Sequence, residues 1–297
     1  MYNFIRSQED LYSVVLLCTV LEVSRSAYYS YRNGWSYRQQ ATEKETETAI
    51  INAFILHRRR YGVRRLVPEL GALGFYIGNF KIRRVLKKHG LKAIQPRSFV
   101  PRTTDSRHPY PISPNLLQDR PLPKAINQVI IGDITYIPLL AGNWAYLCVW
   151  LDLYSRKVIG WALADHMREE LVVGAFKKVL NNRTFSQSTI IHSDRGGQYA
   201  GKIFRKLLDK SKVMQSMSRA DNPYDNAFME SYFSRFKAEL LEGGAFESME
   251  DAQTEIFEYI EMYYNPVRRH SSLGYISPLD FENAIDQVQL STSSGRN

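Results

Sequence analysis

Two features that often place a protein in a class or compartment are scarce in this chain. Only Cys18 and Cys148 occur among 297 residues, and neither belongs to a CxxC or Cys–His pattern. The sequence therefore supports neither a disulfide framework nor a zinc finger. It also lacks an apolar run that could span a bilayer, and MYNFIRSQED at the start lacks the basic region and apolar core of a secretion signal. We expect a cytoplasmic protein with no membrane partner.

Acidic residues are scarce in the first part of the chain. Residues 1–120 hold 20 Lys and Arg against 9 Asp and Glu, whereas residues 121–297 hold 19 against 21. Such a basic segment is typical of phosphate contacts with DNA, although cations that only keep a surface soluble are the alternative. The cations gather in RRRYGVRR and KIRRVLKK. The candidate DNA-binding residues there are Arg58, Arg59, Arg60, Arg64, Arg65, Lys81, Arg83, Arg84, Lys87 and Lys88.

Helical periodicity dominates this basic part. In residues 1–36 it predicts two short helices around a turn, with Leu11, Val14, Val15, Cys18 and Leu21 on the buried face. Residues 37–95 are expected to form a charged helix over 37–57 and a second helix-turn-helix over 61–91. In its second helix the cations fall opposite the apolar positions, as a recognition helix requires. Tyr28, Tyr29 and Tyr31 could stack on bases, but core packing is the better interpretation.

Seven of the twelve prolines lie in residues 96–126, which we expect to be an extended linker. Residues 127–285 then read as a catalytic domain and 286–297 as a disordered tail. Within the domain, strands are expected at 129–138, 145–153, 157–164, 189–192 and 213–217, and helices at 168–180, 200–210, 226–241 and 248–264. Three successive strands followed by alternating helices and strands is the order of an α/β, RNase H-like core, in which a mixed five-stranded sheet carries flanking helices.

Two aspartates stand in or beside expected strands of this domain. Asp133 interrupts the apolar run VIIGDITYIP, where an uncompensated charge would cost several kcal/mol. Asp194 follows a strand in IIHSDRGGQY, and Gly196 and Gly197 after it allow a close approach of metal or phosphate. Carboxylate oxygens suit Mg²⁺ or Mn²⁺ and suit Zn²⁺ poorly. We predict a site for two such ions.

The third expected ligand is Glu230, on the helix over 226–241. Its helical neighbours Ala227 and Ser234 are small, which leaves room for metal and DNA. Lys237 returns to nearly the same face two turns later, and Glu239 lies too far around the helix to pair with it. We therefore expect Lys237 to contact a phosphate of the DNA.

Several alternatives stay open at this point. An isolated Glu on a helix is usually a surface charge, and Asp225 could replace Glu230, although its place before the helix favours an N-cap. Asp152, at a strand end, is expected to pair with Arg156 instead of binding metal. His192 could be a core histidine or a catalytic auxiliary.

The words around these acids resemble a known family, the retroviral-integrase-like DDE transposases of bacterial insertion sequences, in particular their downstream-frame (OrfB-type) products. The resemblance covers about residues 11–281. It runs through YGVRRLVPELGALGFYIGNFKIRRVLKKHGLKA, NQVIIGDITYI, LDLYSRKVIGWAL, HSDRGGQY, SMSRADNPYDNAFMESYFSRFKAE and YNPVRRHSSLGYISP. It implies an RNase H-like fold, Asp133, Asp194 and Glu230 as catalytic metal ligands, and Lys237 beside a phosphate.

The same resemblance implies partners and further residues. Double-stranded DNA with terminal inverted repeats, a homo-oligomer on DNA and an upstream-frame partner or fusion are expected, in a bacterial, nucleoid-associated protein. Arg195 joins the DNA-binding candidates, and the supporting candidates are Thr135, His192, Asn226 and His270, the last with ordering of the C-terminal segment as its first interpretation.

The sequence departs from the family pattern at two positions. Ile130 stands where Trp is usual, and Asp221 replaces the usual Gly.

The two other functions to be weighed are a DNA-binding regulator or inactive remnant without catalysis, and an RNase H-like nuclease without strand transfer.

Overall fold

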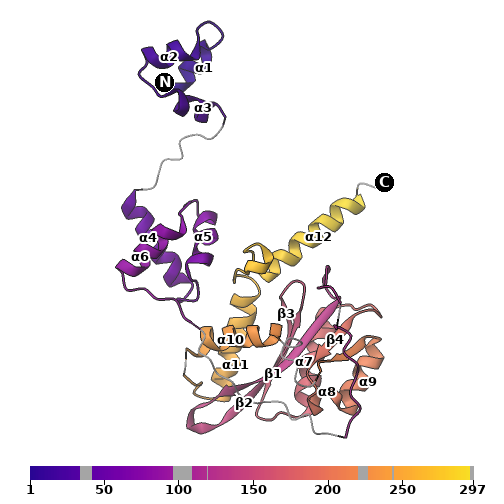
Figure 1. The fold of residues 1–297 in the computed structure, drawn as a ribbon. Coiled ribbons are helices and arrows are strands. Elements are labelled where there is room, and N and C mark those ends of the chain that lie inside the picture. Colours follow the sequence, from indigo (N-terminus) through magenta and orange to yellow (C-terminus); the bar gives the residue numbers. More distant parts are fainter. Residues whose placement is uncertain (34–41, 96–108, 119, 220–226, 243, 295–297) are drawn as a thin grey trace.

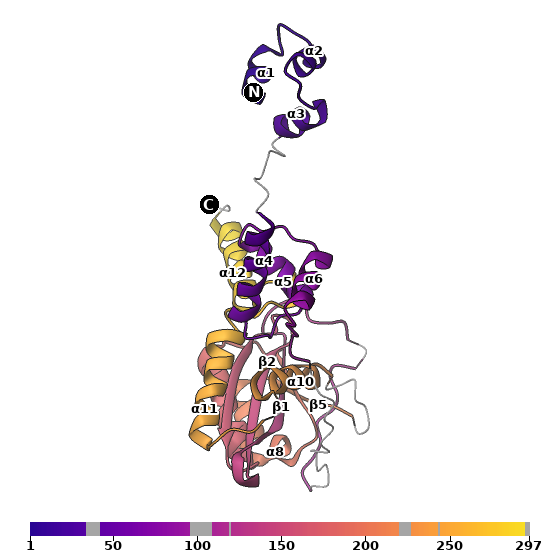
Figure 2. The ribbon, with the colours of Figure 1, turned by 90° about the vertical axis from the view of Figure 1, so that its left-hand side faces the viewer.

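The computed structural model describes residues 1–33, 42–95, 109–118, 120–219, 227–242 and 244–294. They form a small N-terminal helical bundle, a second helical unit, and a larger unit built on a β-sheet (Figure 1). The second helical unit lies against the C-terminal part of the larger one (Figure 2). Within the described ranges, every helix is too short or too polar to cross a membrane.

The N-terminal bundle has three helices, one more than the periodicity predicts: α1 (Tyr2–Gln8), α2 (Val14–Val20) and α3 (Arg25–Arg32). Its core consists of Ile5, Leu17, Cys18 and Tyr28. The predicted buried face was therefore wrong at Leu11 and Val15, which are exposed: Leu11 lies in the turn before α2, and in α2 it is Leu17 that packs with Ile5 of α1.

The second unit consists of α4 (Glu43–Leu56), α5 (Val63–Ala72) and α6 (Asn79–Lys88). Thr42 and Glu45 form a reciprocal capping box at the start of α4, which satisfies backbone donors that a helix end leaves unpaired. Ile50, Ala53 and Phe54 form the apolar face of α4 and are buried in the core of this unit.

The sheet of the larger unit has five strands in the order β3-β2-β1-β4-β5. The first three pair antiparallel, and β1, β4 and β5 are parallel, which confirms the mixed sheet expected from the sequence. A 3₁₀ turn, η1 (Leu140–Gly142), joins β1 to β2, and Gly142 takes a positive φ of 76° there. The strands are β1 (Val129–Pro138), β2 (Trp144–Asp152), β3 (Val158–Ala164), β4 (Ile190–Ser193) and β5 (Met214–Met217).

Each face of the sheet has its own helical cover. One face packs against α7 (Glu169–Asn182), α8 (Gly197–Ala200) and α9 (Lys202–Ser211), and the other against α10 (Ala227–Leu241) and α11 (Met249–Phe257) (Figure 1). Alternation along β1 divides its side chains accordingly, with Val129, Ile131 and Ile137 in the α10 layer and Ile130 and Ile134 in the α7 layer. Both faces of this central strand are thus buried, as its apolar run predicts.

Beyond α11 the chain does not continue as the plain α-helix expected through residue 264. A π-helical segment, η3 (Glu258–Tyr264), follows directly, and η4 (Ser271–Leu273) and α12 (Pro278–Ser294) complete the chain. The expectation of a disordered tail over 286–297 is wrong for residues 286–294, which continue α12. Ser277 caps that helix by accepting the Asp280 N–H, and no Gly or Pro after Pro278 interrupts the helix formers that follow.

The described part of the proline-rich segment is extended, as expected, but it is tied to the sheet edge. Ser113 Oγ donates to Gln215 Oε1 of β5, the Leu116 N–H donates to Ser216 Oγ, and Leu116 and Leu117 pack on the α10-side core. Residues before the boundary expected at 127 therefore already pack on the larger unit, the catalytic domain expected from the sequence.

Candidate active site

Asp133 lies at the centre of the sheet, on the face that α10 crosses. It pairs across β1 and β2 with Val149 and is half-buried, and its Oδ1 accepts the N–H of Ile134 at 2.8 Å. Its neighbour Gly132 faces the other way, where a Cβ would stand 2.3 Å from ring carbons of Trp150. Trp150 packs with Phe176, Tyr199 and Phe204, so an aromatic cluster supports β1 although Ile130 replaces the usual Trp.

Asp194 follows the end of β4, the parallel neighbour of β1. The parallel register pairs Ile131 of β1 with His192 of β4. Asp133 and Asp194 each lie two residues further along, and are therefore at the same level. Asp194 Oδ1 accepts the Gly196 N–H at 2.9 Å, which turns the chain into α8.

The electrostatics support the same placement of the two aspartates. Burial raises the pKa of the Cys148 thiol, and the negative charges of Asp133 and Asp194 both raise it further. The pKa of the buried Tyr199 phenol is raised for the same reasons. Asp133 and Asp194 therefore act electrostatically on the same two buried side chains.

Helix α10 brings Lys237 to this site. Burial lowers the pKa of Lys237, and the charge of Asp133 opposes that shift. The helix geometry considered from the sequence included only carboxylates on the same helix, whereas the acid that acts on Lys237 lies on β1. Glu239 points elsewhere and is buried against Arg268.

Glu230 lies in the first turn of α10, two turns before Lys237, and is exposed. In the part of the chain that the structure describes, no three His, Cys, Asp or Glu side chains are close enough to hold one metal ion. The structure thus places the two aspartates together, with Glu230 on the helix that crosses them but not in contact distance. Asn226, Asp221 and Asp225 lie outside the described residues.

The other supporting residues have structural contacts. Thr135 is buried two residues from Asp133 on the same side of β1. His192 is buried in β4, and its Nδ1 lies 2.8 Å from Ser216 Oγ of β5. Arg195 donates through Nε to the carbonyl of Ser218 at 2.7 Å, which joins the loops after β4 and β5.

Asp152 does not form the expected side-chain pair with Arg156. It is fully buried, and its carboxylate accepts the N–H groups of Asn127, Tyr154 and Ser155, so that it organises the turn after β2. The Arg156 guanidinium lies instead over the ring of Phe228, 4.5 Å from its centroid. The interpretation of Asp152 as a structural residue and not a metal ligand agrees with these contacts.

The cations of α6 divide into two groups. Arg84 pairs with Glu43 at 3.3 Å and Lys88 with Glu47 at 2.8 Å, both on α4. Arg83 and Lys87 are exposed and Lys81 is half-buried.

The cations of RRRYGVRR divide in a similar way. Arg58 and Arg64 are exposed, and Arg59 pairs with Glu242 at 2.8 Å while remaining half-exposed. Arg60 donates to the carbonyl of Glu239 and Arg65 to the carbonyl of Arg269, both in the catalytic unit.

His270 orders the C-terminal segment, as its first interpretation has it. Its N–H donates to the Ile276 carbonyl, and its ring packs edge-on against Tyr264. Burial and then the charges of Arg268, Arg65 and Arg156 lower its pKa to about 2, so this histidine is neutral at ordinary pH.

Comparison with known proteins decides the family. The family model described as "Integrase core domain" matches residues 123–223, a second with the same description matches 211–278, and an "HTH-like domain" matches 40–99. The curated transposase InsF for insertion sequence IS3A of Escherichia coli K12 is 37% identical over 285 residues, which cover 95% of this chain and 98% of that protein. The chain belongs to the IS3-type insertion-sequence transposases. It is a DNA transposase, and hence a polynucleotidyl transferase.

The transposase is similar to two further proteins. An uncharacterized 31 kDa protein of insertion element IS600 from Shigella sonnei is 37% identical over 272 residues, covering 92% of this chain and 99% of that one. The catalytic core domain of BIV integrase aligns with a TM-score of 0.42 at 15% identity, over 55% of this chain and 99% of that chain. The assignment rests on the curated relatives and not on that structural alignment.

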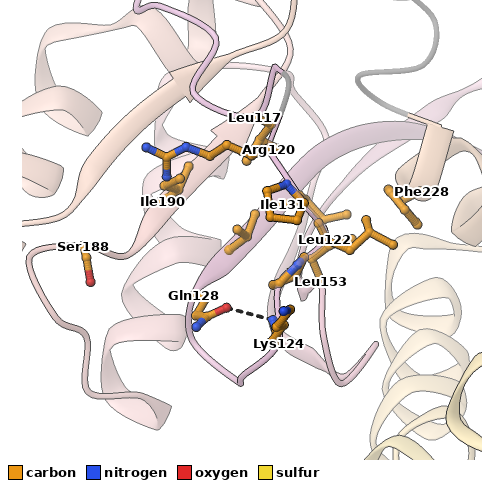
Figure 3. Close-up of a pocket in the computed structure, with 13 residues that line it drawn as sticks. Leu117, Arg120, Leu122, Lys124, Gln128, Ile131, Leu153, Ser188, Ile190 and Phe228 are labelled. Atoms are coloured by element: carbon orange, nitrogen blue, oxygen red, sulfur yellow. Dashed lines mark hydrogen bonds between the residues drawn. The ribbon is translucent and has the colours of Figure 1, made fainter.

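The transposase also has a cavity of about 660 Å³ at the start of β1, beside the aspartates' face of the sheet (Figure 3). Val129, Ile131 and Ile190 form its apolar floor, and Arg120 and Lys124 stand on the segment that borders it. Neither Asp133 nor Asp194 lines it.

Sequence reasoning missed a set of polar residues at the junction between the second helical unit and the larger unit of the transposase. They are His57, Tyr61, Glu69, Glu239, Arg268 and Arg269. The one sequence signal, for Arg268 and Arg269 alone, was the polar stretch YNPVRRHSSLGY with its two adjacent arginines.

Proposed function

We propose that Asp133, Asp194 and Glu230 hold two Mg²⁺ or Mn²⁺ ions, and that this transposase cleaves the ends of its insertion element and joins them to target DNA. The observation that carries the proposal is the placement of Asp133 and Asp194 at the same level of two parallel strands, where both act on Cys148 and Tyr199.

The residues present fit such ions. All three are carboxylates, the hard-oxygen ligands that Mg²⁺ prefers, and Mg²⁺ often uses only one or two protein carboxylates together with substrate phosphates. Two aspartates held by rigid strands and a glutamate on a neighbouring helix match that requirement. When bound, the ions would neutralise charge on the phosphodiester and activate the attacking hydroxyl or water.

The remaining residues of the site bind and orient the DNA. Lys237, half-buried beside Asp133, would hold a phosphate next to the scissile bond. On the second unit, Arg83, Lys87, Lys81, Arg58 and Arg64 would contact phosphates or bases of the terminal inverted repeats. A homo-oligomer on DNA, an upstream-frame partner or fusion, and a place on the nucleoid in the bacterial cytoplasm belong to the same proposal.

The direct test is incubation of the full chain with Mg²⁺ and a labelled duplex carrying the element's own ends. Asp133→Asn, Asp194→Asn and Glu230→Gln should each abolish cleavage and joining and leave DNA binding intact, because metal ligands act as a unit. Asp209→Asn, an exposed aspartate on α9, is the matched control and should be fully active. Retained joining by Glu230→Gln would assign the third position to Asp225 instead.

The products of this reaction also separate the two alternative functions. A regulator or inactive remnant would bind ends without metal-dependent nicking. A nuclease without strand transfer would cut but give no joined product.

The role of Lys237 has its own test. Lys237→Ala should lower cleavage and end-specific binding, and Lys237→Arg should recover part of both because the charge remains. Wild-type cleavage by Lys237→Ala near physiological salt would show that no phosphate passes this residue.

A further inference from the structure

The contact between the α4–α6 unit and the catalytic unit is made by side chains that the sequence alone assigned to DNA. Arg60 is half-buried, and its Nε donates to the carbonyl of Glu239 in α10 at 3.2 Å. Its guanidinium lies over the rings of both Tyr259 and Tyr263, 5.1 and 4.5 Å from their centroids. Such cation–π contacts strengthen when they are shielded from water.

Tyr61 extends the same contact with a fully buried ring. Its hydroxyl donates to the carbonyl of Val267 at 3.1 Å and accepts the N–H of Arg269 at 2.8 Å. The ring of His57 stacks on it at 3.7 Å between centroids. Both hydrogen-bonding functions of the hydroxyl are therefore used across the junction.

Arg65 and Glu69 of α5 complete the junction. Arg65 Nε donates to the carbonyl of Arg269 at 2.9 Å, and Glu69 accepts Arg269 Nε at 2.6 Å. Burial, together with the nearby charge of Arg268, lowers the pKa of Arg65. The Nε–H of this half-buried cation is thus directed into the protein and not toward a passing phosphate.

On the side of the larger unit, the residues of the junction are bonded to Glu239 of α10. Glu239 is buried and binds Arg268 through both carboxylate oxygens, and Tyr259 also donates to it. The π-helical segment η3 supplies Tyr259 and Tyr263, the two rings around Arg60. Arg60 thus contacts the backbone of the helix that carries Glu230 and Lys237, at the same residue that Arg268 anchors from within.

We propose that Arg60, Tyr61 and Arg65 are positioning residues that lock the α4–α6 unit onto α10, and so hold Glu230 and Lys237 in place for catalysis. They are then not DNA contacts. The inference rests on the proposed catalytic role of Glu230. It implies that DNA bound on α6 is held in a fixed relation to the catalytic helix of the same chain.

The test uses the full chain and a duplex that ends in the terminal repeat flanking its coding sequence. Arg60→Ala should leave the dissociation constant and its salt dependence unchanged, and lower the single-turnover cleavage rate at saturating protein by about 10- to 100-fold, because small misplacements of catalytic groups are costly. Arg60→Lys should recover part of the rate, because it keeps a cation over the two rings.

Two comparison variants separate positioning from phosphate binding. Arg64→Ala, in the same motif but exposed, should weaken binding and make the salt slope shallower by about 1. Lys210→Ala removes an exposed cation from α9, on the other face of the sheet, and should change neither binding nor cleavage. If Arg60→Ala behaves like Arg64→Ala, or cleaves at the parental rate, the positioning role is wrong.

Hydrogen exchange tests the lock independently of cleavage. Arg60→Ala and Tyr61→Phe should speed amide exchange in residues 236–241 and 258–269 and leave α7 unchanged. Tyr61→Phe keeps the packed ring, and so serves if Arg60→Ala fails to fold. A parent protein without Mg²⁺-dependent cleavage would overturn the proposed function, whereas unchanged exchange in α10 would overturn the lock itself.

Discussion

The buried ion pair between Arg268 and Glu239 should be one of the most sensitive points of the catalytic unit. Arg268 is 2% exposed and Glu239 6% exposed. Arg268 Nη2 lies 2.5 Å from Glu239 Oε1 and Nε lies 2.8 Å from Oε2, and Tyr259 donates to Oε2 at 2.9 Å. We predict that Arg268→Met is strongly destabilising.

The magnitude follows from what the substitution leaves behind. Without Arg268, Glu239 keeps one hydrogen bond from Tyr259 and remains a buried carboxylate without its hydrogen-bonded cation. Removal of one partner of such a pair costs about 3–5 kcal/mol. In a unit of this size, that corresponds to a fall in melting temperature of about 6–20 °C. The double variant Arg268→Met with Glu239→Gln carries no buried charge, and should recover at least ~1 kcal/mol of that loss.

Calorimetry of the full chain can follow the transition of the catalytic unit separately, since a chain with several units need not unfold in one step. The control is Arg84→Met, whose pair with Glu43 is 61% and 77% exposed, and which should cost at most about 1 kcal/mol. If Arg268→Met melts within the range of this surface variant, or if the double variant is no better than the single, the pair does not carry the predicted charge penalty.

Two further predictions concern a glycine and a carboxylate. Gly132→Ala should destabilise the protein by about 1–3 kcal/mol or more, because its Cβ would meet the Trp150 ring at 2.3 Å. The control Gly174→Ala, whose Cβ would have nothing within 4 Å, should be neutral or stabilising. Thermal melts compare the two variants. His57 and Arg269 hold the pKa of Glu69 at about 2 against the effect of burial. Glu69 therefore contributes stability above its unfolded pKa that is lost as pH falls from about 4.5 to 2, so Glu69→Gln should lose less stability than the parent over that interval, and equal losses would refute the shift.

The sheet could be predicted from the sequence because its strands carry strong local patterns. The apolar run around Asp133 is buried on both faces, and short turns bound the antiparallel strands on each side. The predicted ends at 129–138 agree fully with β1, and those of β2 and β3 differ by one residue. The spacing of apolar residues predicts only which side of a single segment is buried. That information is sufficient for the strands of the sheet and for the apolar face of α4.

The N-terminal bundle shows where that information is insufficient. Leu11 and Val15 fit a helical repeat, but the inward side of α2 is selected by α1, which the sequence reasoning did not include. The same holds for residues 286–294. Their polar composition suggested disorder, whereas α12, capped at its start by Ser277, continues through them without an intervening Gly or Pro.

The arginine cluster is the most instructive difference between sequence and structure. Charge is visible in a sequence, but the direction of a side chain is not, and adjacent arginines at 58–60 and 64–65 looked equivalent. Arg58 and Arg59 adopt positive φ angles of 48° and 63°, so the chain turns sharply just before Arg60. That turn leaves Arg58 and Arg64 at the surface and directs Arg60 and Arg65 into the junction.

This division changes how the charge of the first 120 residues should be interpreted. A count of cations predicts electrostatic affinity for DNA, but Arg60 and Arg65 donate to backbone carbonyls of the catalytic unit, and Arg84 and Lys88 pair with α4. The surface available to phosphates is therefore smaller than the sequence suggests. Of the cations withdrawn from it, Arg60 and Arg65 connect the helical unit to the larger unit. Under the roles proposed above, one short basic motif would serve both the binding of DNA and the placement of α10.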